Sequence, residues 1–133
     1  MKNLTFILMF QLMFCGLVAQ KTCDTSVVRV DANTFKILLE KKDGKLIDVR
    51  TPQEFKTGYI SGAVNIDYRS DNFKEKINKL DKSKTYYVYC EVGGRSSDAA
   101  IYMKTQGFCK VVTLQRGLHA WKMLDYPIII PEK

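Results

Sequence analysis

The sequence has few of the residues from which metal sites are usually built. Its 133 residues include one histidine and four cysteines, and the cysteines lack the C-x-x-C spacing of zinc-binding motifs. His119, the only histidine, belongs to no Cys/His motif. We expect it at the surface or at the rim of a site, rather than as a catalytic base. The sequence therefore predicts no metal site.

Basic motifs, internal repeats and low-complexity tracts are also missing. The formal net charge is +7, but the lysines and arginines are scattered among acidic residues, so we expect no nucleic-acid partner. A positive field of this kind can still attract small anionic substrates. The length and a hydrophobic content of 46% favour one globular domain with a proper core.

The longest apolar run lies at the N-terminus. Leu4 to Ala19 is mostly apolar and follows the short basic start Met1-Lys2-Asn3, and Leu17-Val18-Ala19 resembles a signal-peptide cleavage site. We therefore predict a secretory signal peptide at residues 1–19 and a mature domain at residues 20–133. The expected location is periplasmic or secreted, with no stable membrane association after cleavage.

Two alternatives for this N-terminal segment are weaker. A retained membrane anchor is disfavoured because the apolar run is shorter than a usual membrane span. A lipoprotein would use Cys15 or Cys23, but Phe14 and Thr22, which precede these cysteines, suit a lipoprotein cleavage site poorly.

Three cysteines would remain in the mature chain, namely Cys23, Cys90 and Cys109. Export implies an oxidising compartment, where an exposed pair of cysteines tends to form a disulfide. Because three is an odd number, two can pair while one stays free and reactive.

Short apolar strands alternate with helical segments along the mature chain. Strands are expected at residues 26–30, 46–50, 63–66, 86–89 and 111–114. Helices are expected after the caps Asp31, Thr51, Ser70 or Asp71, and Ser96, and again at residues 117–123. Nearly all the strands are apolar, which is typical of a parallel sheet covered on both faces. The predicted fold class is α/β, with ligands beyond the carboxyl ends of the strands.

Two local patterns add detail to this arrangement. Thr51-Pro52-Gln53-Glu54 is a strong helix start, with threonine as N-cap, proline at the first helical position and glutamate at the third. Near the C-terminus, Pro127 and Pro131 bracket the apolar tail Ile128–Ile130. We expect this tail to lie extended on the body of the domain.

The chemistry is concentrated where the fourth expected strand ends, at Cys90. Gly93, Gly94 and Arg95 follow, and backbone N–H groups in such a loop, together with the start of the next helix, form a cradle for an anion. A cysteine in this setting is favoured as the thiolate, the form that acts as a nucleophile. We therefore interpret Cys90 as a nucleophile. The alternative, a buried structural cysteine, needs no glycines after it.

The residues after Cys90 are the predicted substrate-binding groups: Glu91, Val92, Gly93, Gly94, Arg95 and Ser96. Arg95 would bind an anionic substrate through its charge and its donors. Ser96 would cap the following helix or donate to the thiolate. The Glu91 side chain is expected to point outward to solvent, because an inward carboxylate would oppose formation of the thiolate.

Asp48 and Arg50 end the second expected strand, on the same side of the sheet as Cys90. An acid and a base this close often simply pair. We expect Asp48 to support the site, and Arg50 to orient the loop or to contact the substrate.

In combination and order, these motifs resemble a single-domain rhodanese, which is a sulfurtransferase. The matching pieces are Ile47-Asp48-Val49-Arg50, Glu54-Phe55, Gly58 to Ile66, Tyr89-Cys90 with Gly93 and Arg95-Ser96, and Val112 to Trp121. They cover nearly the whole mature chain. The resemblance implies a rhodanese-like fold, in which a parallel sheet of five strands has helices on both faces.

The resemblance also implies a reaction. Cys90 would attack the outer sulfur of a small anionic donor such as thiosulfate and become a persulfide, and a thiol or cyanide-like acceptor would take that sulfur. The loop N–H groups and Arg95 would stabilise the persulfide and the charge of the donor. No metal and no organic cofactor are implied.

The length of the loop and two departures from the family pattern refine this expectation. The loop from Cys90 to Arg95 holds six residues, whereas the phosphatases that share this fold have one residue more, so we expect no phosphatase activity. Tyr59 stands where the family usually has histidine, and Arg116 stands where a glycine is common. The first should affect only packing, and the second could tighten or charge the mouth of the site.

In this fold family the first strand lies beside the fifth, and Cys23 and Cys109 each lie just before one of these strands. The resemblance therefore implies a Cys23–Cys109 disulfide, which would leave Cys90 as the free thiol. Two other functions stay open. One is a thiol-redox or arsenate-type reaction at Cys90, and the other is a module that carries or senses sulfur without fast turnover.

Overall fold

The computed structural model describes Cys23 and residues 25–132. The predicted signal peptide, residues 1–19, lies outside these described residues. Among the helices that the structure does describe, none has the length and apolar character needed to span a membrane.

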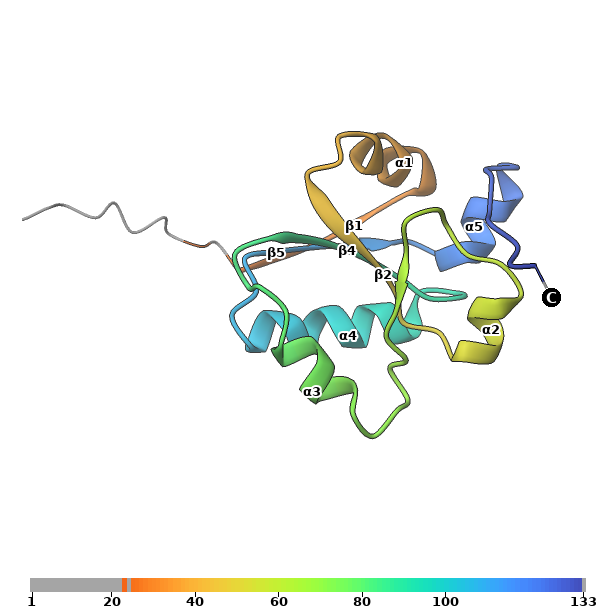
Figure 1. The fold of residues 1–133 in the computed structure, drawn as a ribbon. Helices are drawn as coiled ribbons and strands as arrows, with labels where there is room; N and C mark the ends of the chain where they lie inside the picture. The colour runs from red at the N-terminus through yellow and green to blue at the C-terminus, as the bar shows by residue number, and fades with distance from the viewer. Residues whose placement is uncertain (1–22, 24, 133) are drawn as a thin grey trace, which may run out of the picture.

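Five parallel strands form one sheet, as the sequence predicts (Figure 1). The strands are β1 (Ser26–Val30), β2 (Gly44–Asp48), β3 (Val64–Asn65), β4 (Thr85–Tyr89) and β5 (Lys110–Leu114). Their order across the sheet is β1-β5-β4-β2-β3, and every neighbouring pair is parallel. The central strands β4 and β2 therefore end at the same edge, where the chain continues into Cys90 and Val49.

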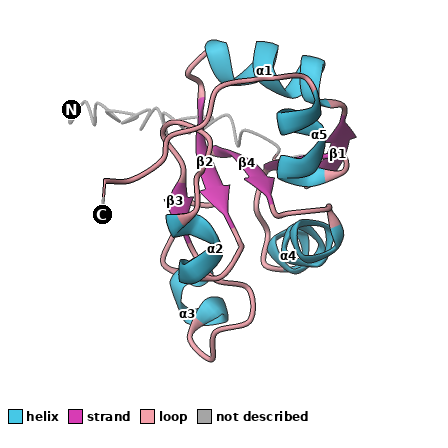
Figure 2. Ribbon diagram, turned by 90° about the vertical axis from the view of Figure 1, so that its right-hand side faces the viewer, coloured by secondary structure: helices cyan, strands magenta, loops and turns pink. Residues whose placement is uncertain are grey.

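Helices cover both faces of the sheet, which confirms the predicted α/β class (Figure 2). They are α1 (Ala32–Glu40), α2 (Pro52–Lys56), α3 (Phe73–Asn78), α4 (Gly94–Thr105) and α5 (Gly117–Met123). One apolar cluster buries α1 and α5 against the sheet through residues such as Phe35 and Trp121. The opposite cluster buries α3 and α4 through residues such as Ile77 and Met103.

The predicted helix starts at Asp31 and Thr51 are confirmed, because each of these side chains caps its helix. Asp31 Oδ1 accepts the Thr34 N–H at 2.8 Å, and Thr51 and Glu54 form the expected capping box of α2. The predicted cap of α3 is wrong, because that helix follows Asn72 and has no side-chain cap. The Ser70 hydroxyl instead donates to the Asp67 carbonyl at 2.7 Å, so the preceding turn occupies it.

The second strand is shifted towards the N-terminus relative to the prediction, since β2 begins at Gly44 and ends at Asp48. A Cβ at Gly44 would lie 2.7 Å from the Thr85 carbonyl oxygen and 2.7 Å from the Tyr87 ring. Glycine at this position therefore lets β2 pair closely with the start of β4. The shift leaves Arg50 beyond the strand, on the loop that leads to α2.

The C-terminal tail lies extended on the domain, as expected. Tyr59 and Ile129 form an antiparallel bridge, with N–H to carbonyl distances of 3.0 and 2.7 Å. Tyr59 also stacks on Phe55, with ring centroids 4.1 Å apart. The tyrosine that departs from the family pattern therefore serves packing between α2 and the tail.

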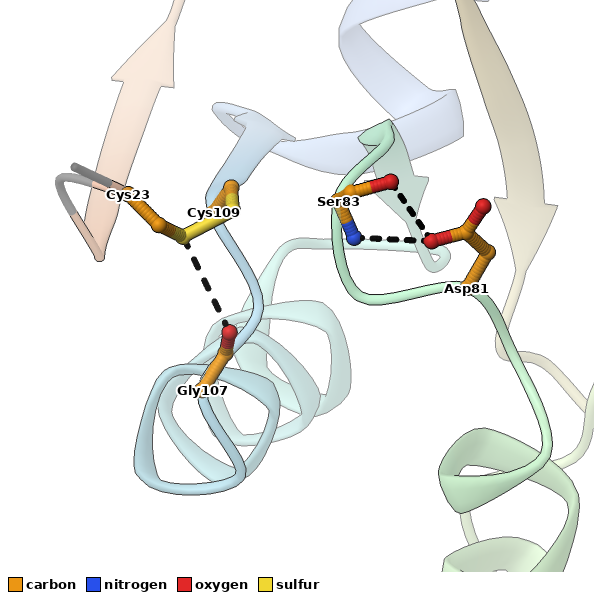
Figure 3. Close-up of a disulfide and its surroundings, with 5 residues drawn as sticks. All are labelled: Cys23, Asp81, Ser83, Gly107 and Cys109. Atoms are coloured by element: carbon orange, nitrogen blue, oxygen red, sulfur yellow. Dashed lines mark hydrogen bonds between the residues drawn. A yellow bond between two sulfur atoms is a disulfide. The ribbon is translucent and has the colours of Figure 1, made fainter. Parts of the chain in front are cut away.

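A disulfide joins the segment before β1 to the segment before β5 (Figure 3). Cys23 and Cys109 are bonded, with their Cα atoms 4.9 Å apart, and Ser26 pairs with Lys110 just beyond them. The Cys109 N–H also donates to the Lys82 carbonyl at 2.9 Å. Among the described cysteines, only Cys90 is left as a free thiol.

Candidate active site

Cys90 follows the last residue of β4 and lies inside a short loop. The residue is 1% exposed, and its Sγ accepts the Gly93 N–H at 3.0 Å. Ser96 Oγ lies 3.4 Å from the same sulfur. The loop therefore curls around the thiol, as the sequence predicts, and a backbone donor stabilises negative charge on sulfur.

The start of α5 holds this loop through two backbone hydrogen bonds. The Leu118 N–H donates to the Cys90 carbonyl at 2.8 Å, and the His119 N–H donates to the Glu91 carbonyl at 3.0 Å. A Cβ at Gly117 would lie only 2.3 Å from the Cys90 carbonyl oxygen. The His119 side chain is exposed, so this residue supports the loop through its backbone.

The helix after the loop starts earlier than predicted. Gly93 is the N-cap of α4, with φ at +105°, and Gly94 is the first helical residue. Ser96 is therefore not the helix cap. It lies buried in the first turn, where its hydroxyl donates to the Gly93 carbonyl at 3.2 Å and faces the Cys90 sulfur. The left-handed conformation at Gly93 explains why the loop needs glycine.

The Arg95 side chain reaches Glu54 of α2. Its Nη1 and Nη2 donate to the two carboxylate oxygens of Glu54, both at 2.7 Å. These hydrogen bonds lower the pKa of Glu54 to about 2. They also raise the pKa of Arg95. The guanidinium that was expected to meet the substrate is thus already matched by a carboxylate.

Asp48 and Arg50 form a buried ion pair beneath the loop. Arg50 Nη2 and Nε donate to Asp48 Oδ2 at 2.7 and 3.0 Å, and the two side chains are 1% and 0% exposed. Burial opposes the charge on Arg50, but the hydrogen bonds and the charge of Asp48 outweigh burial and raise the pKa of the guanidinium. Asp48 thus pairs with Arg50 at the end of β2, and its support of the site stays a prediction.

Arg50 ties this pair to the loop and to the turn after α2. Its Nη1 donates to Glu91 Oε2 at 3.1 Å, and its Nη2 donates to the Gly58 carbonyl at 2.6 Å. The Glu91 side chain has the predicted outward orientation only in part, because it is 36% exposed but one carboxylate oxygen accepts a hydrogen bond from Arg50. The alternative of a substrate contact by Arg50 is also not supported, since its buried guanidinium is engaged by protein groups. These contacts favour the predicted loop-orienting role for Arg50.

The model of the rhodanese-like domain family matches residues 31–124. The chain belongs to the rhodanese-like family. A sulfurtransferase of Allochromatium vinosum is 32% identical over 95 residues, which cover 71% of this chain and 87% of that protein. The thiosulfate sulfurtransferase GlpE of Vibrio cholerae is 28% identical over 101 residues, which cover 76% of this chain and 93% of the relative.

A solved structure gives the same family assignment. The rhodanese-like domain protein of Staphylococcus aureus aligns with a TM-score of 0.68 and 31% identity, and the alignment covers 79% of this chain and 99% of that structure. The solved structure and the family match over residues 31–124 therefore place this chain in the same family.

Three residues of the rhodanese-like site were not predicted to contribute to it. Asn65 Nδ2 donates to the Asp48 and Arg50 carbonyls at 3.0 and 2.8 Å, which fixes the exit of β2. The Tyr89 hydroxyl accepts the Ile60 N–H at 3.0 Å, and burial raises the pKa of this tyrosine. Glu54 was expected only as a capping residue. All three residues lie in segments that match the rhodanese pattern, but the sequence analysis assigned no role in the site to any of them.

The Glu54–Arg95 pair predicts a pH dependence of stability. The folded-state pKa of Glu54 lies near 2, below its ordinary 4.5, so its contribution is full above about pH 4.5 and is lost as the pH falls through the folded value. Since the carboxylate is 34% exposed, we expect that contribution to be only about 1–2 kcal/mol after solvent screening. Glu54→Gln should therefore lower the free energy of unfolding at pH 7 by this amount.

Urea unfolding at several pH values tests the Glu54 prediction. The wild type should lose more stability between about pH 4.5 and pH 2 than Glu54→Gln does. Glu75→Gln is the matched control, because Glu75 pairs with Lys79 at the surface and should change stability by less than about 0.5 kcal/mol. Parallel pH profiles for the wild type and Glu54→Gln would contradict the assignment.

Proposed function

We propose that this rhodanese-like protein transfers sulfane sulfur from a donor such as thiosulfate to a thiophilic acceptor through a persulfide on Cys90. The observation that carries the proposal is the position of Cys90 Sγ, inside a loop whose Gly93 N–H reaches it at 3.0 Å. Backbone amides of α5 hold the carbonyls of Cys90 and Glu91. The Gly93 N–H is therefore in position at the Cys90 sulfur before any substrate arrives. The sulfurtransferase names of the relatives support the same class of reaction.

The proposed reaction has two displacement steps. The Cys90 thiolate attacks the outer sulfur of thiosulfate, a sulfur–sulfur bond forms, and the old sulfur–sulfur bond breaks so that sulfite leaves with the electron pair. The acceptor, cyanide or a thiolate, then attacks the outer sulfur of the persulfide. The electron pair of the broken bond returns to Cys90, so the protein is regenerated and no external oxidant is needed.

The structural role of the loop fits both steps. Negative charge lies on the Cys90 sulfur before the first step and after the second, and on the outer sulfur between them. The Gly93 N–H is directed at the first position, and the Ser96 hydroxyl is close enough to turn towards it. Both groups therefore stabilise Cys90 as an attacking and as a leaving group.

We also propose that the protein acts outside the cytoplasm. The Cys23–Cys109 bond supports this location, since disulfides persist mainly in oxidising compartments. The bond would leave Cys90 unable to pair within the mature chain, and therefore free to carry sulfur.

Mass spectrometry of the exported, unreduced protein tests these proposals together. After incubation with thiosulfate, we expect a mass gain of one sulfur on the peptide that contains Cys90, and we expect thiocyanate when cyanide is added. Cys90→Ala should show neither change. The intact mass should fit a chain that begins at Gln20 with one disulfide. The sulfurtransferase proposal fails if several sulfane donors give neither persulfide nor transfer, and a retained N-terminus would refute cleavage.

A further inference from the structure

A cavity of about 400 Å³ lies against the outer side of the Cys90 loop. Three loop residues, Val92, Gly93 and Gly94, form one wall of the cavity. Arg29 from β1 and Arg116 from the turn before α5 also line it. No acidic residue is among the described residues that line this space. The cavity is thus both adjacent to the loop and positively charged.

The two arginines of this cavity differ from those beneath the loop. Arg50 and Arg95 form ion pairs with Asp48, Glu91 and Glu54. In the described part of the chain, neither Arg29 nor Arg116 is in an ion pair. Arg29 Nη2 donates only to the Ser97 hydroxyl, at 2.9 Å.

The charge balance near Cys90 explains why these unpaired arginines matter. Two arginines, Arg50 and Arg95, are opposed by three carboxylates in the ion pairs beneath and beside the loop. This set carries one net negative charge even before the thiolate is counted. An anionic sulfur donor is repelled by such a set. Beyond the loop N–H groups, full positive charge for attracting the donor has to come from residues other than Arg50 and Arg95.

The backbones of both arginines are fixed relative to the loop, and among the described residues the Arg116 guanidinium itself donates only to Met123 Sδ, 3.9 Å from Nη2. The backbone nitrogen of Arg116 lies 3.4 Å from the position that a Cβ of Gly93 would take. Arg116 has φ at +60°, a conformation that non-glycine residues seldom adopt. On the other wall, Ser97 holds Arg29 through its hydroxyl, and the Gln115 N–H joins β1 by donating to the Val30 carbonyl at 2.8 Å.

We propose that Arg29 and Arg116 form an oxyanion subsite, which binds the sulfonate-like end of an anionic sulfur donor beside the Cys90 loop. This inference rests on the proposed sulfur transfer and names the class of donor for it. It assigns the positive charge for the substrate to Arg116, which was expected to tighten or charge the mouth of the site, and to Arg29, which the sequence did not single out, in place of Arg50 and Arg95.

Binding to a protein that cannot react separates this inference from the proposed function. In Cys90→Ser, thiosulfate should shift the amide signals of Gly93 and Gly94 in titrations followed by NMR. Adding Arg29→Gln or Arg116→Gln should each weaken that binding by about 3- to 10-fold, the range expected for one exposed charge pair strengthened by direct hydrogen bonds. Lys110→Gln removes one charge from the amino end of β5 and should leave the binding constant unchanged.

Steady-state kinetics give the second test. Each arginine variant should raise the KM for thiosulfate by a similar factor, with little change in kcat, and the difference from wild type should shrink at high salt because ions screen exposed charges. Unchanged binding and unchanged KM in Arg29→Gln/Arg116→Gln would overturn the subsite. If the arginine variants weaken binding but no persulfide ever forms on wild-type Cys90, the subsite stands and the proposed function fails.

Discussion

Asp48→Asn should destabilise the protein by about 3–5 kcal/mol, because it leaves the buried Arg50 guanidinium without its closest counter-charge. Asp48 is fully buried and accepts hydrogen bonds from the Arg50 backbone and side chain. The asparagine has almost the same shape, so the loss reports charge and not volume. A domain of this size is stable by only about 5–15 kcal/mol, so the midpoint of urea unfolding should fall by a large fraction.

The double variant Asp48→Asn/Arg50→Gln tests whether the ion pair is the cause. Removing both charges leaves neither one uncompensated, so the double variant should lose clearly less stability than the sum of the two single losses. Asp98→Asn, at an exposed position on α4, is a charge-matched control and should change stability by less than about 0.5 kcal/mol. Additive losses in the double variant would show that Asp48 and Arg50 act independently.

The same pair also links stability to activity. Arg50 joins Asp48 to Glu91 of the loop and to the Gly58 carbonyl. Without Asp48, Arg50 has only these weaker anchors, and the loop loses part of its support. We therefore expect sulfur transfer in Asp48→Asn to fall at temperatures where the variant is still folded.

Most of the fold could be predicted because local patterns and tertiary structure agree. The alternation of apolar strands and helices fixes a parallel sheet, and Cys90 was placed at its carboxyl edge because the apolar run from Tyr86 stops there. The Thr51–Glu54 capping box needs only four consecutive residues. Such features depend on neighbours in the sequence, so they can be read from it.

The partners of charged residues could not be predicted in the same way. Glu54 and Arg95 lie far apart in the sequence, and their pairing depends on how α2 meets the loop. Glu91 was expected to face solvent because an inward carboxylate would oppose the thiolate, and the sequence does not reveal that Arg50 Nη1 lies within reach of its carboxylate. Arg29 drew no attention, since it looks like an ordinary outward residue of an edge strand. Only the fold brings it to the loop.

The close approach of Gly117 to the Cys90 loop is likewise visible only in the fold. Substituting this glycine should have the second large effect on the protein. Gly117→Ala should reduce sulfur transfer by more than about 100-fold, since a displacement of about 1 Å in a catalytic group can cost that much. The new Cβ would lie 2.3 Å from the Cys90 carbonyl oxygen and 2.7 Å from the Glu91 carbonyl carbon. The loop backbone has to move away from α5, and the Leu118 hydrogen bond to Cys90 lengthens or breaks.

Gly107→Ala separates this clash from backbone strain. Gly107 and Gly117 both have positive φ, at +87° and +55°, but a Cβ at Gly107 would meet nothing within 4 Å. Both variants should lose about 1–2 kcal/mol of stability from the left-handed conformation alone, which urea unfolding measures. Only Gly117→Ala should also lose persulfide formation. If Gly117→Ala kept normal activity, the backbone of α5 would not be what holds the Cys90 loop in its reactive shape.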